Sequence, residues 1–197
     1  QTCALPISET IGSLAGGGTT GGNVTLNATL TAGGNNTSTT YAGVMSGGGS
    51  LIKTGTGAMS LTGANTYTGG TTVETGTLAL VGGSISHPTG SVTVGSGAGS
   101  TATLMINGGT LTSASGRIGS GDVSGSGGAS GMVAVADGSW VASGAITVGN
   151  HEAGTLTIEG GGLVSTLAAC IAGVVGPSSR TTCWAVGASV STGSAPR

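Results

Sequence analysis

The stretch LIKTGTGAMSLTGANTYTGGTTVETGTLALV, residues 51–81, decides the fold. Apolar residues alternate there with Thr, Ser or Lys in short runs, and each run is bounded by Gly or Asn. Because successive side chains of an extended chain point to opposite faces, this alternation predicts short β-strands with one buried face. We expect Leu51, Leu61, Val73 and Leu78 on that face.

The composition of the whole chain agrees with short strands separated by glycine turns. The 197 residues include 44 Gly and no Phe, only 5% are charged, and the formal net charge is -2. An ordinary domain is about 25% charged and about 7% Gly. Val, Ile, Leu and Thr recur throughout, so the chain has apolar side chains to bury and little charge to keep it extended. A flexible Gly/Thr/Ser-rich linker is the alternative, and a cooperative melt with a β-type circular dichroism spectrum would exclude it.

A second, longer unit repeats from about Ser91 onward. Three copies begin at Leu104, Met132 and Leu156, and each contains three short apolar runs that close on glycine. One such unit cannot bury its own apolar face, so stacked neighbours must supply the core. The equivalent positions Ile106, Val135 and Ile158, together with Val148 and the four residues named above, are expected to form one continuous core.

Residues 51–81 also resemble a known family, the autotransporter-associated β-strand repeat. The family pattern runs Leu-x-Lys-x-Gly-x-Gly, Leu-x-Gly-x-Asn-x-Tyr-x-Gly-Gly-Thr and Val-x-x-Gly-x-Leu. The matching residues are Lys53, Gly55, Gly57, Leu61, Gly63, Asn65, Tyr67, Gly69, Gly70, Thr71, Val73, Gly76 and Leu78. The resemblance implies an all-β fold, a right-handed single-stranded parallel β-helix (β-solenoid), here an open-ended fragment.

The same resemblance implies a function. It implies a stalk or adhesin segment of a passenger exported by type V secretion and displayed on the outer membrane of a Gram-negative bacterium. The implied partners are a C-terminal β-barrel translocator, which this chain lacks, and host or cell surfaces. The alternative is part of a β-helix carbohydrate-active enzyme whose active site lies outside this fragment.

The sequence divides into four segments. Residues 1–7, QTCALPI, translate a stretch of a common sequencing adapter, so we expect native sequence to begin near Ser8. Residues 8–90 are expected to form the part of the β-helix that carries the family repeat, and residues 91–176 the longer coils. Residues 177–197 lose the periodicity and are expected to be an irregular or truncated tail.

Two classes of partner are not expected. The four Lys and Arg residues are scattered and make no basic patch, so no nucleic-acid footprint is predicted. No run of 18 or more apolar residues occurs, so no direct membrane insertion of this segment is predicted.

The residues that could carry hydrolytic chemistry are few. A triad needs a nucleophile, a base and an orienting acid. The two histidines are His87, which precedes Pro88 at an expected turn, and His151, and no G-x-S-x-G motif occurs. We expect both histidines in solvated loops.

The acidic residues do not form an acid/base pair in sequence. Glu74, Asp122, Asp137, Glu152 and Glu159 are dispersed, whereas glycosidases need paired carboxylates. Asp122 stands alone in its glycine-rich stretch, whereas calcium-binding nonapeptide repeats need such an Asp in series. We therefore expect no enzyme activity, no catalytic or metal-binding residue and no cofactor in this segment.

Aromatic residues and cysteines are expected to play structural or incidental parts. Trp140 and Tyr67 could be exposed adhesive aromatics, but packing in the core or at a turn is favoured. Cys3, Cys170 and Cys183 make no even set for a disulfide framework. Cys170 and Cys183 could pair, although free or incidental thiols are favoured.

Overall fold

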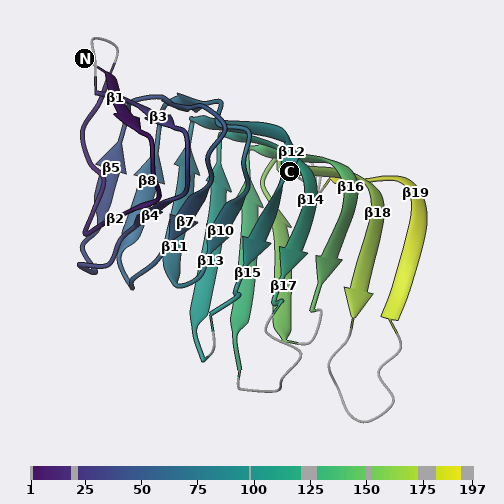
Figure 1. The fold of residues 1–197 in the computed structure, drawn as a ribbon. Helices are drawn as coiled ribbons and strands as arrows, with labels where there is room; N and C mark the ends of the chain where they lie inside the picture. The colour runs from purple at the N-terminus through teal and green to yellow at the C-terminus, as the bar shows by residue number, and fades with distance from the viewer. Residues whose placement is uncertain are drawn as a thin grey trace.

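The chain folds into parallel coils of β-strand stacked along one axis (Figure 1). This computed structural model describes residues 2–18, 22–97, 99–120, 128–149, 152–172 and 181–191. Every regular element in these ranges is a strand, and the strands assemble into three sheets. The all-β solenoid expected from the alternation is confirmed.

The largest sheet has ten strands in the order β19-β18-β16-β14-β12-β10-β7-β4-β2, with β9 paired to β12 off this path. They are β2 (Glu9–Ile11), β4 (Leu30–Ala32), β7 (Leu51–Lys53), β9 (Ala64–Asn65), β10 (Thr71–Val73), β12 (Ser84–Val94), β14 (Thr110–Ile118), β16 (Ser139–Val148), β18 (Leu163–Ala172) and β19 (Thr181–Ser191).

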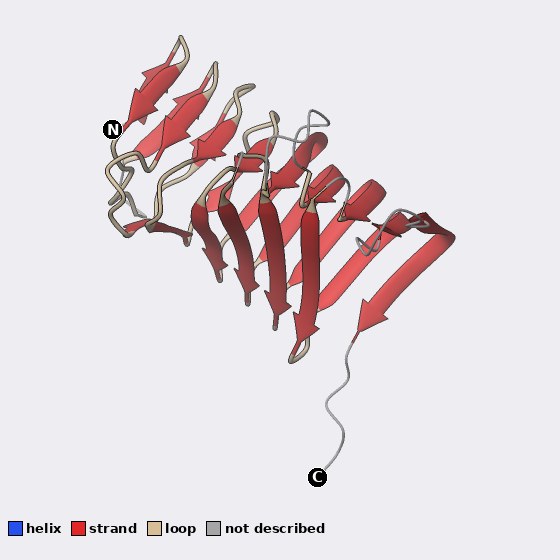
Figure 2. Cartoon of the chain, turned by 90° about the horizontal axis from the view of Figure 1, so that it is seen from below, coloured by secondary structure: helices blue, strands red, loops and turns tan. Residues whose placement is uncertain are grey.

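The two smaller sheets complete each coil. The 6-stranded sheet contains β5 (Thr39–Tyr41), β8 (Ala58–Leu61), β11 (Gly76–Val81), β13 (Thr101–Asn107), β15 (Ser130–Ala136) and β17 (Ala153–Glu159). The 3-stranded sheet contains β1 (Thr2–Leu5), β3 (Asn23–Leu26) and β6 (Met45–Ser46). Figure 2 shows the rows of strands facing one another along the length of the molecule.

The strand register confirms the equivalences read from the repeats. Ile106 pairs with Val135 between β13 and β15, and Val135 pairs with Ile158 between β15 and β17. Because register partners in a parallel sheet point to the same face, residues at these positions stack in a column inside the solenoid. Each coil thereby covers the apolar face of its neighbour.

The expected core is also confirmed. Leu51, Leu61, Val73, Leu78, Ile106, Val135 and Val148 are buried in one continuous cluster, and Ile158 is partly buried against it. Burial of a side chain of this size contributes about 1.5–3 kcal/mol. The strands are short, so most of the stabilisation comes from this column rather than from any single strand.

The expectation of three short strands per coil is correct only for the N-terminal coils. There the path runs through separate strands such as β7, β8 and β9 before it reaches β10. From β12 onward the second and third strands merge into one long strand with an irregularity in its middle. The register shifts lie at His87/Ser91, Ser113/Gly116, Ala142/Ala145 and Thr166/Ala168. Such irregularities bend a strand without ending it, and the chain turns its corner there.

Glycine is required at one stacked corner of the N-terminal coils. Gly55 and Gly76 have φ values of 70° and 68°, which favour glycine over other residues. A Cβ at Gly76 would also meet the carbonyl oxygen of Gly55, and a Cβ at Gly55 would meet that of Gly33. The close approach of successive backbones explains why the repeat places glycine at this corner.

The two ends of the described chain also pair with the sheets. β1, inside the segment expected to be adapter-derived, pairs in parallel with β3, and most of its side chains are exposed. β19 lies in the segment expected to be an irregular tail, and it pairs with β18 in antiparallel fashion. Within the described residues, no helix is long and apolar enough to cross a membrane.

Candidate functional site

Several polar side chains lie inside the solenoid. Those that are buried among the described residues are Lys53, Asn65, Thr71, His87, Ser113 and Thr166. In the part of the chain that the structure describes, no buried side-chain nitrogen or oxygen lacks a hydrogen-bond partner. A fully satisfied interior is typical of side chains that hold structure together.

Lys53 is a buried cation held by backbone carbonyl groups. It is 1% exposed, and its Nζ donates to the carbonyl oxygens of Thr54 at 2.6 Å, Gly55 at 2.8 Å and Thr75 at 3.3 Å. Burial lowers the pKa of this ammonium group. Three carbonyl acceptors use all three donors of the ammonium. Lys53 therefore ties a corner of its own coil to the same corner of the next coil.

Asn65 also joins neighbouring coils through hydrogen bonds to backbone groups, at another corner. Its Oδ1 accepts a hydrogen bond from the Met45 backbone N–H at 3.0 Å, and its Nδ2 donates to the carbonyl oxygens of Gly63 at 3.1 Å and Ser84 at 3.0 Å. Asn23 similarly accepts from the Val44 N–H at 3.0 Å. A buried amide side chain here replaces the backbone partners that a corner cannot supply.

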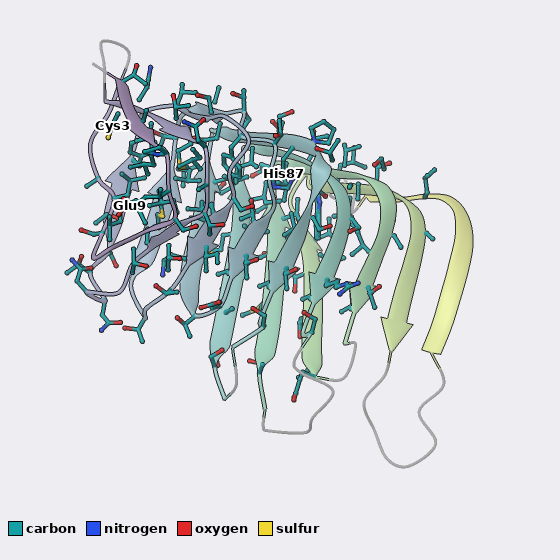
Figure 3. The ribbon with its side chains drawn as sticks, viewed as in Figure 1. Cys3, Glu9 and His87 are labelled. Carbon is teal, nitrogen blue, oxygen red and sulfur yellow. The ribbon has the colours of Figure 1, made fainter. Side chains whose placement is uncertain are left out.

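His87 corrects one sequence prediction. It was expected in a solvated loop, but it lies within β12 and is 0% exposed (Figure 3). Pro88 does not end the strand, because it falls at the irregularity between His87 and Ser91, where a missing ladder hydrogen bond is tolerated. The alternation of side chains along the strand could have shown this. Ile85 is buried, and His87, two positions later, lies on the same face.

His87 belongs to a buried chain of hydrogen bonds. Its Nε2 lies 2.9 Å from Thr71 Oγ1, and its Nδ1 lies 3.2 Å from the carbonyl oxygen of Gly90. Thr71 Oγ1 also lies 2.7 Å from the hydroxyl of Tyr67, whose ring is tilted against the imidazole at a centroid distance of 5.7 Å. Burial lowers the pKa of His87 and raises that of Tyr67. The interior position of Tyr67 agrees with the expectation that it packs in the core.

Trp140 is likewise an interior residue. It is fully buried, and its indole Nε1–H donates to Ser113 Oγ at 3.0 Å. Its ring lies against Gly116, where a Cβ would collide with the indole. The aromatic ring therefore fills the solenoid at a place where the neighbouring coil has no side chain, which agrees with the expectation of core packing.

Two of the described carboxylates accept hydrogen bonds from backbone N–H groups. Asp137 accepts a hydrogen bond from the Gly161 backbone N–H at 3.0 Å, and Glu152 accepts one from the Gly128 N–H at 3.1 Å. Both bonds join neighbouring coils. Glu159 is exposed on β17. Among the described residues, no group of three or more His, Cys, Asp or Glu could hold a metal ion.

Several residues weighed in the sequence lie outside the described structure. These are Asp122, His151 and the side chains of Cys170 and Cys183. The backbone register places Cys170 opposite Cys183 between β18 and β19. Cys3 is an exposed free cysteine.

The hollows of the surface carry little chemistry. One lies at the N-terminal end and is lined by residues that include Cys3, Leu14 and Tyr41. A second is lined by Thr, Ser and Gly side chains and backbone around Thr75 and Ser100. Neither has a charged side chain in its lining, and the titratable groups of the first are the Cys3 thiol and the Tyr41 phenol.

The geometry therefore defines a class of protein, a parallel β-solenoid whose buried polar groups bind its own backbone. Comparison with known proteins adds the family to which its repeat is similar. Residues 51–80 match the model of the Passenger-associated-transport-repeat family. The repeat identified in the sequence is thus confirmed as one of the autotransporter passenger type.

One relative extends the similarity beyond the repeat. Over 69 residues the chain is 48% identical to the adhesin BmaC autotransporter of Brucella suis biovar 1 (strain 1330). The aligned segment is 34% of this chain and 2% of that adhesin, so the similarity covers a small part of the relative. No solved structure matches the chain.

Three of the polar side chains that form hydrogen bonds inside the solenoid lie within the residues that match the family model. Lys53, Asn65 and Tyr67 lie inside residues 51–80 and are the polar side chains that bind corners of the coils or the buried hydroxyl chain. Because they contact this chain's own backbone and side chains, the matched motif describes how the coils stack.

Proposed function

We propose that this chain is a structural segment of a surface-displayed autotransporter passenger, a stalk or adhesin part exported by type V secretion. It performs no catalysis of its own. In the whole protein a C-terminal β-barrel translocator carries it to the outer surface of a Gram-negative bacterium, where the passenger contacts host or other cell surfaces. The observation that carries the proposal is the passenger-type repeat at residues 51–80 within a solenoid.

Two further observations support a structural role. Two of the described acidic side chains, Asp137 and Glu152, bond the backbone of a neighbouring coil, as groups that hold the coils together do. The relative whose sequence matches is named an adhesin. A long stack of coils whose polar groups are internally satisfied holds other parts of a passenger away from the membrane without needing a ligand of its own.

Surface display is the direct test. Residues 8–197 would be fused between a cleavable secretion signal and a C-terminal translocator, with an epitope tag at the N-terminal side. We expect the tag to be labelled by antibody on intact cells and to be removed by external protease. The matched control is the same fusion with the translocator deleted, which should label only permeabilised cells. A fusion that stays in the periplasm with an intact translocator would contradict the proposal.

Absence of catalysis has its own test. Purified protein is expected to show no turnover of pectin-like polysaccharides or peptides. Cleavage that Glu152→Gln or His151→Ala abolishes would contradict the structural proposal and favour the carbohydrate-active or hydrolytic alternative. Cleavage that both variants retain would indicate a contaminating enzyme.

A further inference from the structure

We propose that His87 is a proton-operated lock between the two stacked coils formed by residues 64–94, which the neutral imidazole holds together and whose contact protonation opens before the coils that follow. The proposal concerns regulation of the solenoid and is independent of the proposed export route. It rests on the direction of each hydrogen bond in the buried Tyr67–Thr71–His87 chain.

The tautomer follows from the partners. A carbonyl oxygen can only accept, so the contact to the Gly90 carbonyl requires a hydrogen on Nδ1 of His87. In the neutral imidazole Nε2 then has no hydrogen, and it accepts the hydroxyl hydrogen of Thr71. Thr71 Oγ1 in turn accepts the hydroxyl hydrogen of Tyr67. Each hydrogen in this series of hydrogen bonds therefore has one acceptor.

Protonation breaks this order. An imidazolium ring carries a second hydrogen on Nε2, which must be donated to Thr71 Oγ1. Thr71 Oγ1 has two lone pairs and can accept from both the imidazolium and the Tyr67 phenol, but the Thr71 hydroxyl hydrogen then loses the acceptor that Nε2 provided. A buried hydroxyl hydrogen without an acceptor destabilises the fold, and the new charge is buried as well.

Among the described residues whose contacts with the His87 ring are known, none is an anion. Tyr67 is the titratable group in contact with His87, and its pKa is raised, so it stays neutral in acid. The register partner of His87 on β14 is Ser113, whose hydroxyl oxygen accepts from Trp140. Lys53, a further buried ionisable side chain, is a cation whose ammonium binds corner carbonyls.

The direction of the pH effect follows from linkage. Burial lowers the pKa of folded His87 below its ordinary value of 6.5, so the unfolded coil binds the proton more tightly. The stabilisation is present above about pH 6.5 and is lost as the pH falls below that value. The opening should begin where His87 bridges β10 and β12, because Thr71 lies on β10 and Gly90 lies on β12.

The test compares hydrogen exchange, read by mass spectrometry, in the natural chain and in His87→Gln at pH 5.0 and pH 7.5. Comparing two proteins in the same buffer removes the intrinsic effect of pH on exchange. For peptides of residues 64–94 the measured quantity is the exchange rate of the natural chain divided by that of the variant. We expect this ratio to be about tenfold higher at pH 5.0 than at pH 7.5. Peptides of residues 101–118 should show no such change in ratio.

A second measurement covers the case in which His87→Gln does not fold. In a His151→Gln background His87 is the single histidine, and its imidazole can be titrated by NMR. A midpoint below 6.5, accompanied by loss of protection in residues 64–94, supports the lock. A midpoint at or above 6.5, or titration with the coil fully protected, overturns it, as does an exchange ratio that is independent of pH.

Discussion

Replacing Asn65 with Ala tests the idea that the polar residues of the repeat act as clips between coils. Asn65 is 0% exposed and joins three backbone groups, the Met45 N–H and the carbonyl groups of Gly63 and Ser84. Alanine would leave the N–H unsatisfied, at a cost of about 1–3 kcal/mol, and would remove two bonds worth about 0.5–1.5 kcal/mol each. We expect a loss of about 3 kcal/mol in the free energy of unfolding.

Thermal melting followed by circular dichroism at pH 7.5 measures the loss. For a chain of this length the expected change corresponds to a fall in Tm of about 6–12 °C. Asn27→Ala is the matched control, because Asn27 is an exposed Asn, and we expect it to change stability by less than about 0.5 kcal/mol.

A second substitution separates the two ends of the amide. Asn65→Asp keeps an acceptor for the Met45 N–H but loses both donated bonds and buries a carboxylate, so it should be less stable than Asn65→Ala at pH 7.5. Its deficit should shrink near pH 4, where a protonated carboxyl can donate again. If Asn65→Ala melts within 1 °C of the natural chain, on the order of the measurement error, the clip argument is refuted.

The remaining predictions concern two other interior contacts. Lys53→Met keeps the apolar stem but leaves three corner carbonyls without their cation, so urea denaturation should show a loss of about 1–3 kcal/mol; a variant as stable as the natural chain would mean that burying the charge offsets the bonds. Gly116→Ala should cost about 1–3 kcal/mol because its methyl group meets the indole of Trp140. In a Trp140→Leu background the same substitution should cost less than half as much, on the order of 1 kcal/mol or below, and equal costs in both backgrounds would rule out that contact.

The sequence was sufficient for the fold because the relevant signal has a period of two. Alternation alone placed Leu51 and Leu78 in the core, and the repeat alone identified Ile106 and Val135 as register partners. Both inferences depend on which face of the strand a residue occupies, and the alternation of apolar and polar residues indicates that face. The merging of two strands in the later coils was not predicted, because register shifts of one or two residues interrupt the apolar pattern only locally.

The buried polar side chains were harder to predict. Their residue types suggest exposure to solvent, whereas their positions in the alternating pattern suggest burial. Histidine before proline is typical of a turn, so His87 was placed in solvent, although its parity with Ile85 marks the inner face. Lys53 presents the same conflict, since lysine is almost never fully buried without partners. The partners are backbone carbonyls of its own and the next coil, and only the stacked structure brings them within reach.

The corners of a solenoid explain why such residues are needed at all. Along the strands each coil satisfies the backbone of the next, but at a corner the ladder is interrupted and buried N–H and C=O groups lose that partner. Water cannot enter the apolar core, so a side chain that both donates and accepts, or a cation with three donors, must replace it. Asn65 and Lys53 meet these needs at two different corners. A repeat pattern that combines glycine, asparagine and lysine at fixed spacing therefore supplies the residues that satisfy buried backbone groups at the corners of the coils. Such a pattern can recur in passengers whatever surface they contact.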